Sequence, residues 1–87
     1  MVTYWYPCDG HPDGPSDSPW FRVAEDGWGY RTATNPAGVD EHNPCFRVVS
    51  GYAYPRLSLP GDEPTFEIIG SFVYRAEGVA WFRIDNR

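Results

Sequence analysis

Three short passages of this chain share one pattern: Trp or Cys, then Phe, Arg and a β-branched residue. They are Trp20-Phe21-Arg22-Val23, Cys45-Phe46-Arg47-Val48 and Trp81-Phe82-Arg83-Ile84. In an extended chain, Phe and the β-branched residue lie on one face of the strand, and Arg lies on the other face. The pattern therefore predicts three equivalent, half-buried β-strands, and it restricts the chain to folds that contain a sheet.

Turn residues after the first two passages predict β-hairpins. Asp26-Gly27 precedes an aromatic run at 28–31, and Ser50-Gly51 precedes another at 52–54. Glycine accepts the positive φ that tight hairpin turns require. The same reasoning predicts further strands, which are 65–69, 71–75 and 79–84, the last two joined through Ala76-Glu77-Gly78. A short strand at 4–6 is predicted to close an edge.

Aromatic residues supply most of the apolar content. The chain has four Trp, six Tyr and five Phe, whereas Leu57 and Leu59 are its only leucines. Aromatic and β-branched residues favour strands, and nine Pro and nine Gly interrupt any long helix. We therefore expect residues 1–87 to form one all-β domain, a small barrel or two-sheet sandwich of about seven short antiparallel strands.

Two long stretches without strand pattern, 7–19 and 33–44, need something to hold them in place. These stretches and the residue that follows the second contain every Cys and His in the chain, arranged as C-x2-H and H-x2-C. Thiolates and imidazoles are the ligands of structural zinc sites, and a two-residue gap lets both side chains reach one ion. We predict a structural Zn2+ that staples the loops and is bound by Cys8, His11, His42 and Cys45.

Other chemistry is compatible with the same residues. The cysteines could form a disulfide, or they could stay unpaired and buried while the histidines lie on the surface. An open zinc site with Glu41 as base, or a Cys/His dyad, would be catalytic. Separately, acidic residues of the loops could bind calcium. The carboxylates considered for calcium are Asp9, Asp13, Asp17, Asp40 and Glu41. Because four protein ligands leave no open position on zinc, we expect no enzymatic activity.

Net charge and composition limit the classes of partner that this chain can bind. The net charge is −5 and lysine is absent, which argues against nucleic acid as a partner. No apolar run is long enough to cross a membrane, and the first residues lack the pattern of a signal peptide. We expect a cytoplasmic protein, or a virion component if a phage encodes it. The absence of lysine with abundant Gly, Pro, Ala and Asp is typical of a GC-rich bacterium or its phage.

So many aromatic side chains cannot all be buried in a domain of this size, so some should form a contact surface. The residues predicted to contact a partner are Trp5, Trp28, Tyr30, Tyr52 and Tyr54. We expect a non-enzymatic module for protein–protein interaction, self-association or assembly, with a phage accessory or decoration protein as its most concrete form. The alternatives are a carbohydrate-binding module that uses the exposed aromatics, and a small zinc hydrolase.

Overall fold

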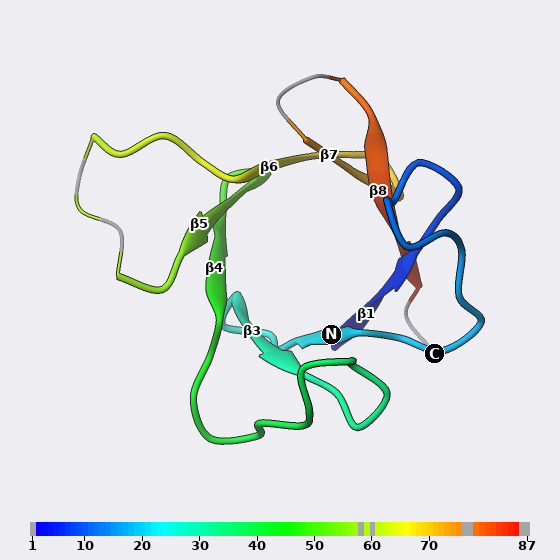
Figure 1. Cartoon of the computed structure of the whole chain (residues 1–87). Coiled ribbons are helices and arrows are strands. Elements are labelled where there is room, and N and C mark those ends of the chain that lie inside the picture. The colour runs from blue at the N-terminus through cyan, green and yellow to red at the C-terminus, as the bar shows by residue number, and fades with distance from the viewer. Residues whose placement is uncertain (1, 58, 60, 76–77, 86–87) are drawn as a thin grey trace.

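Eight short strands form a closed antiparallel barrel in the computed structural model, which describes residues 2–57, 59, 61–75 and 78–85. The strands are β1 (Thr3–Pro7), β2 (Phe21–Val23), β3 (Trp28–Arg31), β4 (Phe46–Val49), β5 (Tyr52–Pro55), β6 (Phe66–Ile69), β7 (Phe72–Tyr74) and β8 (Ala80–Asp85). Each strand pairs with the next one, and β8 pairs with β1, so the sheet forms a ring (Figure 1). Because consecutive strands alternate in direction, the first and eighth strands meet antiparallel.

The predicted strands are confirmed, and the sheet closes as a barrel rather than splitting into a sandwich. The barrel has eight strands instead of about seven, because the predicted edge segment is the full strand β1, which pairs with both β2 and β8. The predicted turn at Ala76 and Glu77 lies outside the described residues. In the described part of the chain there is no helix, and so none that could cross a membrane.

The turn between β4 and β5 has the backbone that its sequence predicts. Val49 pairs with Tyr52, which leaves Ser50 and Gly51 as a two-residue connection. Both residues have positive φ, 52° for Ser50 and 83° for Gly51. Two positive φ angles give this turn the twist that the flanking strands need, and glycine adopts such an angle without steric cost.

Aromatic rings fill the interior of the barrel. Trp5 is only 1% exposed and stacks on Phe46, with ring centroids 4.7 Å apart. The edges of Phe21 and Phe66 meet the same indole at 6.4 and 6.1 Å. The buried core cluster consists of Trp5, Val23, Phe46, Ala53, Val73 and Phe82.

The prediction that Trp5 contacts a partner is wrong. Its neighbours across the sheet are Phe21 on β2 and Ile84 on β8, and both pack against the core. Side chains alternate between the two faces of a strand, so Trp5 points into the barrel together with these neighbours. Burial leaves this indole with no surface for a partner.

Gly29 makes room for the stacked rings. It pairs with Phe46 across β3 and β4, and it is buried. A Cβ atom at position 29 would overlap with the Phe46 ring. The small residue therefore lets the phenyl ring lie flat against β3 and reach Trp5.

Replacing Trp5 with alanine should lower the free energy of unfolding by about 3–5 kcal/mol, because a large buried ring leaves a cavity that the barrel cannot fill. Urea unfolding followed by circular dichroism measures the change. Trp28→Ala is the matched control, since Trp28 is only partly buried on the outer wall, and it should cost clearly less. Equal losses in the two variants would contradict the placement of Trp5 at the centre of the core.

Candidate functional site

Cys8 and His11 lie in a tight turn after β1, where the barrel supplies other partners for both. The Cys8 thiol donates to the carbonyl oxygen of Ala80 on β8 at 3.2 Å. The His11 ring is 8% exposed and meets the rings of Trp20 and Trp81 edge-on, each at 4.7 Å. His11 Nδ1 accepts a hydrogen bond from the backbone amide of Asp13 at 3.0 Å. The imidazole is therefore a packed part of the barrel wall.

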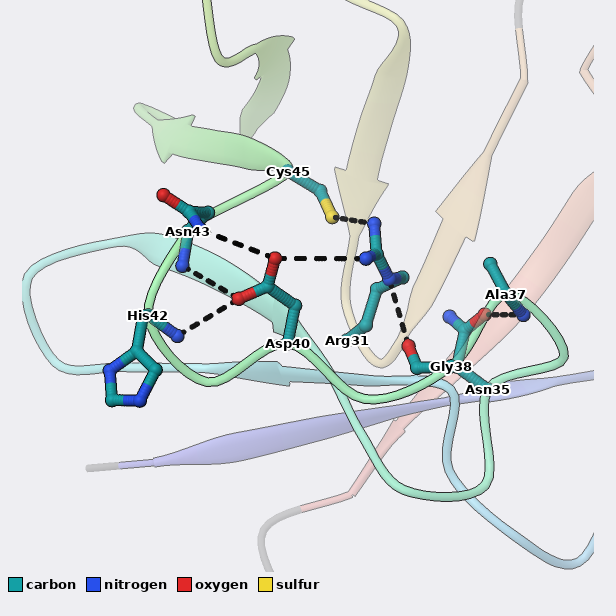
Figure 2. A network of polar contacts seen from close by, with 8 residues as sticks. All are labelled: Arg31, Asn35, Ala37, Gly38, Asp40, His42, Asn43 and Cys45. Carbon is teal, nitrogen blue, oxygen red and sulfur yellow. Dashed lines mark hydrogen bonds and ion pairs between the residues drawn. The ribbon is translucent and has the colours of Figure 1, made fainter.

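His42 and Cys45 lie in the loop before β4, which is organised by Asp40. The Asp40 carboxylate accepts hydrogen bonds from the backbone amides of His42 and Asn43, at 3.1 and 2.9 Å. It also lies 3.7 Å from the guanidinium of Arg31, which in turn contacts Cys45 Sγ at 3.8 Å. Figure 2 shows the Cys45 sulfur directed toward Arg31, while the exposed His42 ring points away from it.

The structure does not bring the four predicted zinc ligands together. Among the described residues, which include all four, no three His, Cys, Asp or Glu side chains are grouped so that they could hold a metal ion. The two cysteines are also not joined to each other. In this arrangement the residues do not fit a closed zinc site, and the carboxylates considered for calcium do not form a site either. Zinc binding stays a prediction without support from the geometry.

Hydrogen bonds join the two long loops instead. The hydroxyls of Thr32 and Thr34 both donate to the carbonyl oxygen of Pro19. The side-chain amide of Asn35, which is 9% exposed, donates to the carbonyl oxygen of Trp20 at 2.9 Å. The backbone amide of Thr32 donates to the same carbonyl oxygen of Trp20 at 3.0 Å. Together these bonds hold the loops to each other without a metal ion.

Two titratable groups in these loops are shifted. Burial lowers the pKa of His11 below its ordinary value of 6.5, and the charge of Asp13 opposes this effect. The hydrogen bond from the Asp13 amide also favours the neutral ring, because it requires an unprotonated Nδ1. Backbone hydrogen bonds from Asn43 and His42 hold the pKa of Asp40 below its ordinary value, and Arg31 adds to the effect.

Folding stability should fall as the pH drops below about 6.5, because the unfolded chain binds a proton at His11 more readily than the folded barrel does. The contribution is complete above the ordinary histidine pKa and is lost as the pH falls toward the lowered pKa of the folded state. Urea unfolding at about pH 8 and about pH 5 measures it. His11→Gln should remove this part of the pH dependence, whereas His42→Gln, at an exposed position, should keep it. Identical pH profiles for the wild type and His11→Gln would contradict the assignment.

A chelator should leave the melting temperature unchanged, because the four predicted ligands, all of them described, are not grouped around a position for a metal ion. Thermal melts with and without EDTA, together with elemental analysis of the purified protein, test this expectation. Cys8→Ser and Cys45→Ser should respond to EDTA as the wild type does. A large drop in the melting temperature with EDTA, and one zinc per chain, would show that the four residues gather around an ion after all.

The outer wall of the barrel provides a second candidate site, around β5. Arg47 on β4 lies between Trp28 on β3 and Tyr54 on β5 in the strand pairing. Its guanidinium lies over the Trp28 ring, 5.3 Å from the ring centroid. These residues line a groove of about 450 Å³ together with Val49, Pro55, Arg56, Leu59, Gly61 and Asp62. We call this depression the Arg47 groove.

A second groove lies on the other side of β5. Glu67 on β6 is placed between Tyr52 on β5 and Tyr74 on β7. The groove has a volume of about 680 Å³, and its lining includes these three residues with Glu63, Pro64, Thr65, Ile69, Arg75 and Gly78. We call it the Glu67 groove. The β5 face is the surface formed by the two grooves and by Phe72, which pairs with Ile69 at the turn between β6 and β7.

Three of the residues predicted to contact a partner, Trp28, Tyr52 and Tyr54, lie on the β5 face. Tyr30 lies farther along β3, beneath the guanidinium of Arg22 at 4.9 Å. The sequence pattern placed Arg47 on the outer face of its strand, but neither Arg47 nor Glu67 was among the residues predicted to contact a partner. The alternation of side chains along β4 and β6 could have identified them, because both residues follow a Phe that points inward.

Comparison with known proteins leaves the geometry as the only guide to function. No protein-family model, curated protein or solved structure matches the chain. The β5 face is the stronger of the two candidate sites, since Cys8, His11 and Asp40 in the loops already have hydrogen-bond partners within the protein.

Proposed function

We propose that this chain is a non-enzymatic module for protein binding or assembly, and that its contact surface is the β5 face. One observation carries the proposal. Eight large hydrophobic side chains are exposed in the described part of the chain, and six of them lie between positions 49 and 72. The six are Val49, Tyr52, Leu57, Leu59, Ile69 and Phe72, and all except Leu57 belong to the β5 face. A concentration of exposed apolar side chains on one side of a small protein is typical of an interaction surface.

The chemistry of the face also favours a protein partner. Trp, Tyr and Arg are the residue types that most often dominate binding energy in protein interfaces, and Trp28, Tyr54 and Arg47 lie next to one another here. They stand on adjacent strands of a closed sheet, so little conformational freedom is lost when a partner binds. A phage accessory or decoration protein is the concrete form of this proposal that the composition supports.

The proposal involves neither structural zinc nor zinc hydrolysis. The four ligands predicted for structural zinc do not form a group that fits the ion among the described residues. A zinc hydrolase needs three protein ligands on one ion, and the described residues offer no such set. The proposed activity therefore depends on surface contacts alone.

Carbohydrate binding is a second candidate, and the Arg47 groove favours it. Two aromatic rings, Trp28 and Tyr54, flank a guanidinium in an open groove of about 450 Å³. Sugar rings stack on such aromatic faces, and a guanidinium donates hydrogen bonds to hydroxyl or carboxylate oxygens. The exposed side chain of Leu59 in this groove fits a protein surface better than it fits a sugar, so we place this function second.

The proposal is tested with a face variant, Tyr54→Ala with Leu59→Ser and Ile69→Ser, and a control variant of another part of the surface, Tyr4→Ala with Val39→Ser. Proteins captured by the wild type are identified and purified, and their binding is measured by calorimetry. The control should bind like the wild type, and the face variant should bind at least about tenfold more weakly, as expected when hot-spot residues are lost.

Three results would contradict the proposal. The face variant could bind a purified partner as tightly as the wild type does. The wild type could bind no protein, including a second copy of itself. Binding on a glycan array that disappears with Trp28→Ala, without any protein partner, would support the carbohydrate function in its place.

A further inference from the structure

The β5 face carries opposite charges on its two sides. On both sides a charged residue is placed between two aromatic residues on neighbouring strands, and the rows are Trp28-Arg47-Tyr54 and Tyr74-Glu67-Tyr52. The rows meet on β5, where Tyr52 and Tyr54 point outward on either side of the buried Ala53. The face is therefore basic toward β4, aromatic along β5 and acidic toward β6.

Both charges are available to a partner. Arg47 and Glu67 are exposed, and neither forms an ion pair with another described residue. The intramolecular contact of Arg47 is with the ring of Trp28, which leaves the hydrogen-bond donors of its guanidinium open to an acceptor. Each groove has a second charge of the same sign, Arg56 beside Arg47 and Glu63 beside Glu67. Each also holds one charge of the opposite sign, Asp62 and Arg75, so the net charge of each groove keeps the sign of Arg47 or of Glu67.

We infer that the partner of this face is a second copy of the same chain, an inference that rests on the proposed function. In a two-fold symmetric dimer, if residue i of one copy contacts residue j of the other, then j also contacts i. We place the two-fold axis in the plane of the interface, perpendicular to the line from Arg47 to Glu67 and through its midpoint. This axis passes over β5, because β5 lies between the strands that carry the two residues. Each Arg47 then lies opposite Glu67 of the second copy, so one interface contains two ion pairs.

The residues near this axis are suited to meet their own counterparts. Tyr52 and Tyr54 are closest to it, and tyrosine rings pack well against each other in edge-on or offset arrangements. Val49 and Ile69, which are 44% and 56% exposed, flank them on β4 and β6 and extend the apolar part of the contact. The centre of the face is thus apolar and its two sides are charged. In the dimer, the basic side of each copy faces the acidic side of the other.

Charge reversal tests the inference by analytical ultracentrifugation over a range of protein concentrations. The wild type should show a monomer–dimer equilibrium. Arg47→Glu places Glu opposite Glu67, and Glu67→Arg places Arg opposite Arg47, so each variant alone should dimerise at least about tenfold more weakly. The double variant should dimerise again, because the two ion pairs are formed with their signs exchanged.

Mixing the two single variants is the sharpest measurement. One copy then has Glu at positions 47 and 67 and the other has Arg at both, so a heterodimer should form at concentrations at which each variant alone dimerises only weakly. Arg22→Glu and Asp17→Arg are controls with matched charge changes elsewhere on the surface, and they should dimerise like the wild type. Unchanged far-ultraviolet circular dichroism confirms that the variants are folded.

The inference is overturned if the wild type is monomeric at every concentration, if a single reversal leaves the dimer intact, or if the mixture does not associate. These failures are distinguishable from failure of the proposed function. A monomeric wild type that still binds another purified protein through the β5 face would remove only the self-association. A monomeric wild type that binds no protein at all would remove both.

Discussion

The stack of Trp5 on Phe46 is the contact on which the rest of the barrel depends. It joins β1 to β4 through the interior, two strands that are not neighbours in the sheet. Rings from β2, β6 and β8 also surround the indole, so one side chain contacts a large part of the wall from within. A chain with few aliphatic residues can fill an eight-stranded barrel in this way, because each ring occupies the volume of several smaller side chains.

The alternation that fills the interior also builds the outer surface. In each of the three repeated passages, Phe packs inward while the next residue, Arg, lies over an aromatic ring on a neighbouring strand. The pairs are Arg22 with Tyr30, Arg47 with Trp28 and Arg83 with Tyr6. The repeated passages therefore supply both core residues of the barrel and charged residues of its outer surface. A substitution that shifted the register of one strand by one residue would exchange core and surface together.

Much of the fold could be predicted from short-range pattern. Period-two alternation located the strands, and residues such as Ser50 and Gly51 located a hairpin turn, because both signals act over a few neighbouring residues. Trp5 was misplaced because it lies between Tyr4 and Tyr6, where three aromatic residues in succession give no indication of which face is buried.

The arrangement of the four predicted zinc ligands could not be predicted from short-range pattern. A two-residue spacing brings Cys8 close to His11 along the chain, but it carries no information about where the second pair lies in space. That distance depends on how the two loops are held, and the bonds from Asn35 and the threonines to Pro19 and Trp20 leave no trace in the spacing of Cys and His. For the β5 face, the sequence pointed to Trp28, Tyr52 and Tyr54 and placed Arg47 outward, whereas Glu67, Phe72 and Tyr74 were not singled out.

The pairing of β1 with β8 also sets the order in which the molecule can become complete. Trp5 on β1 packs against Phe82 on β8, so the interior stays open to water on one side until the last strand has joined the first. Local hairpins can form early, but this closing contact spans almost the whole chain and has a high entropic cost. On the ribosome, the barrel should therefore reach its native state only after β8 has emerged, with the earlier strands dependent until then on protection from aggregation.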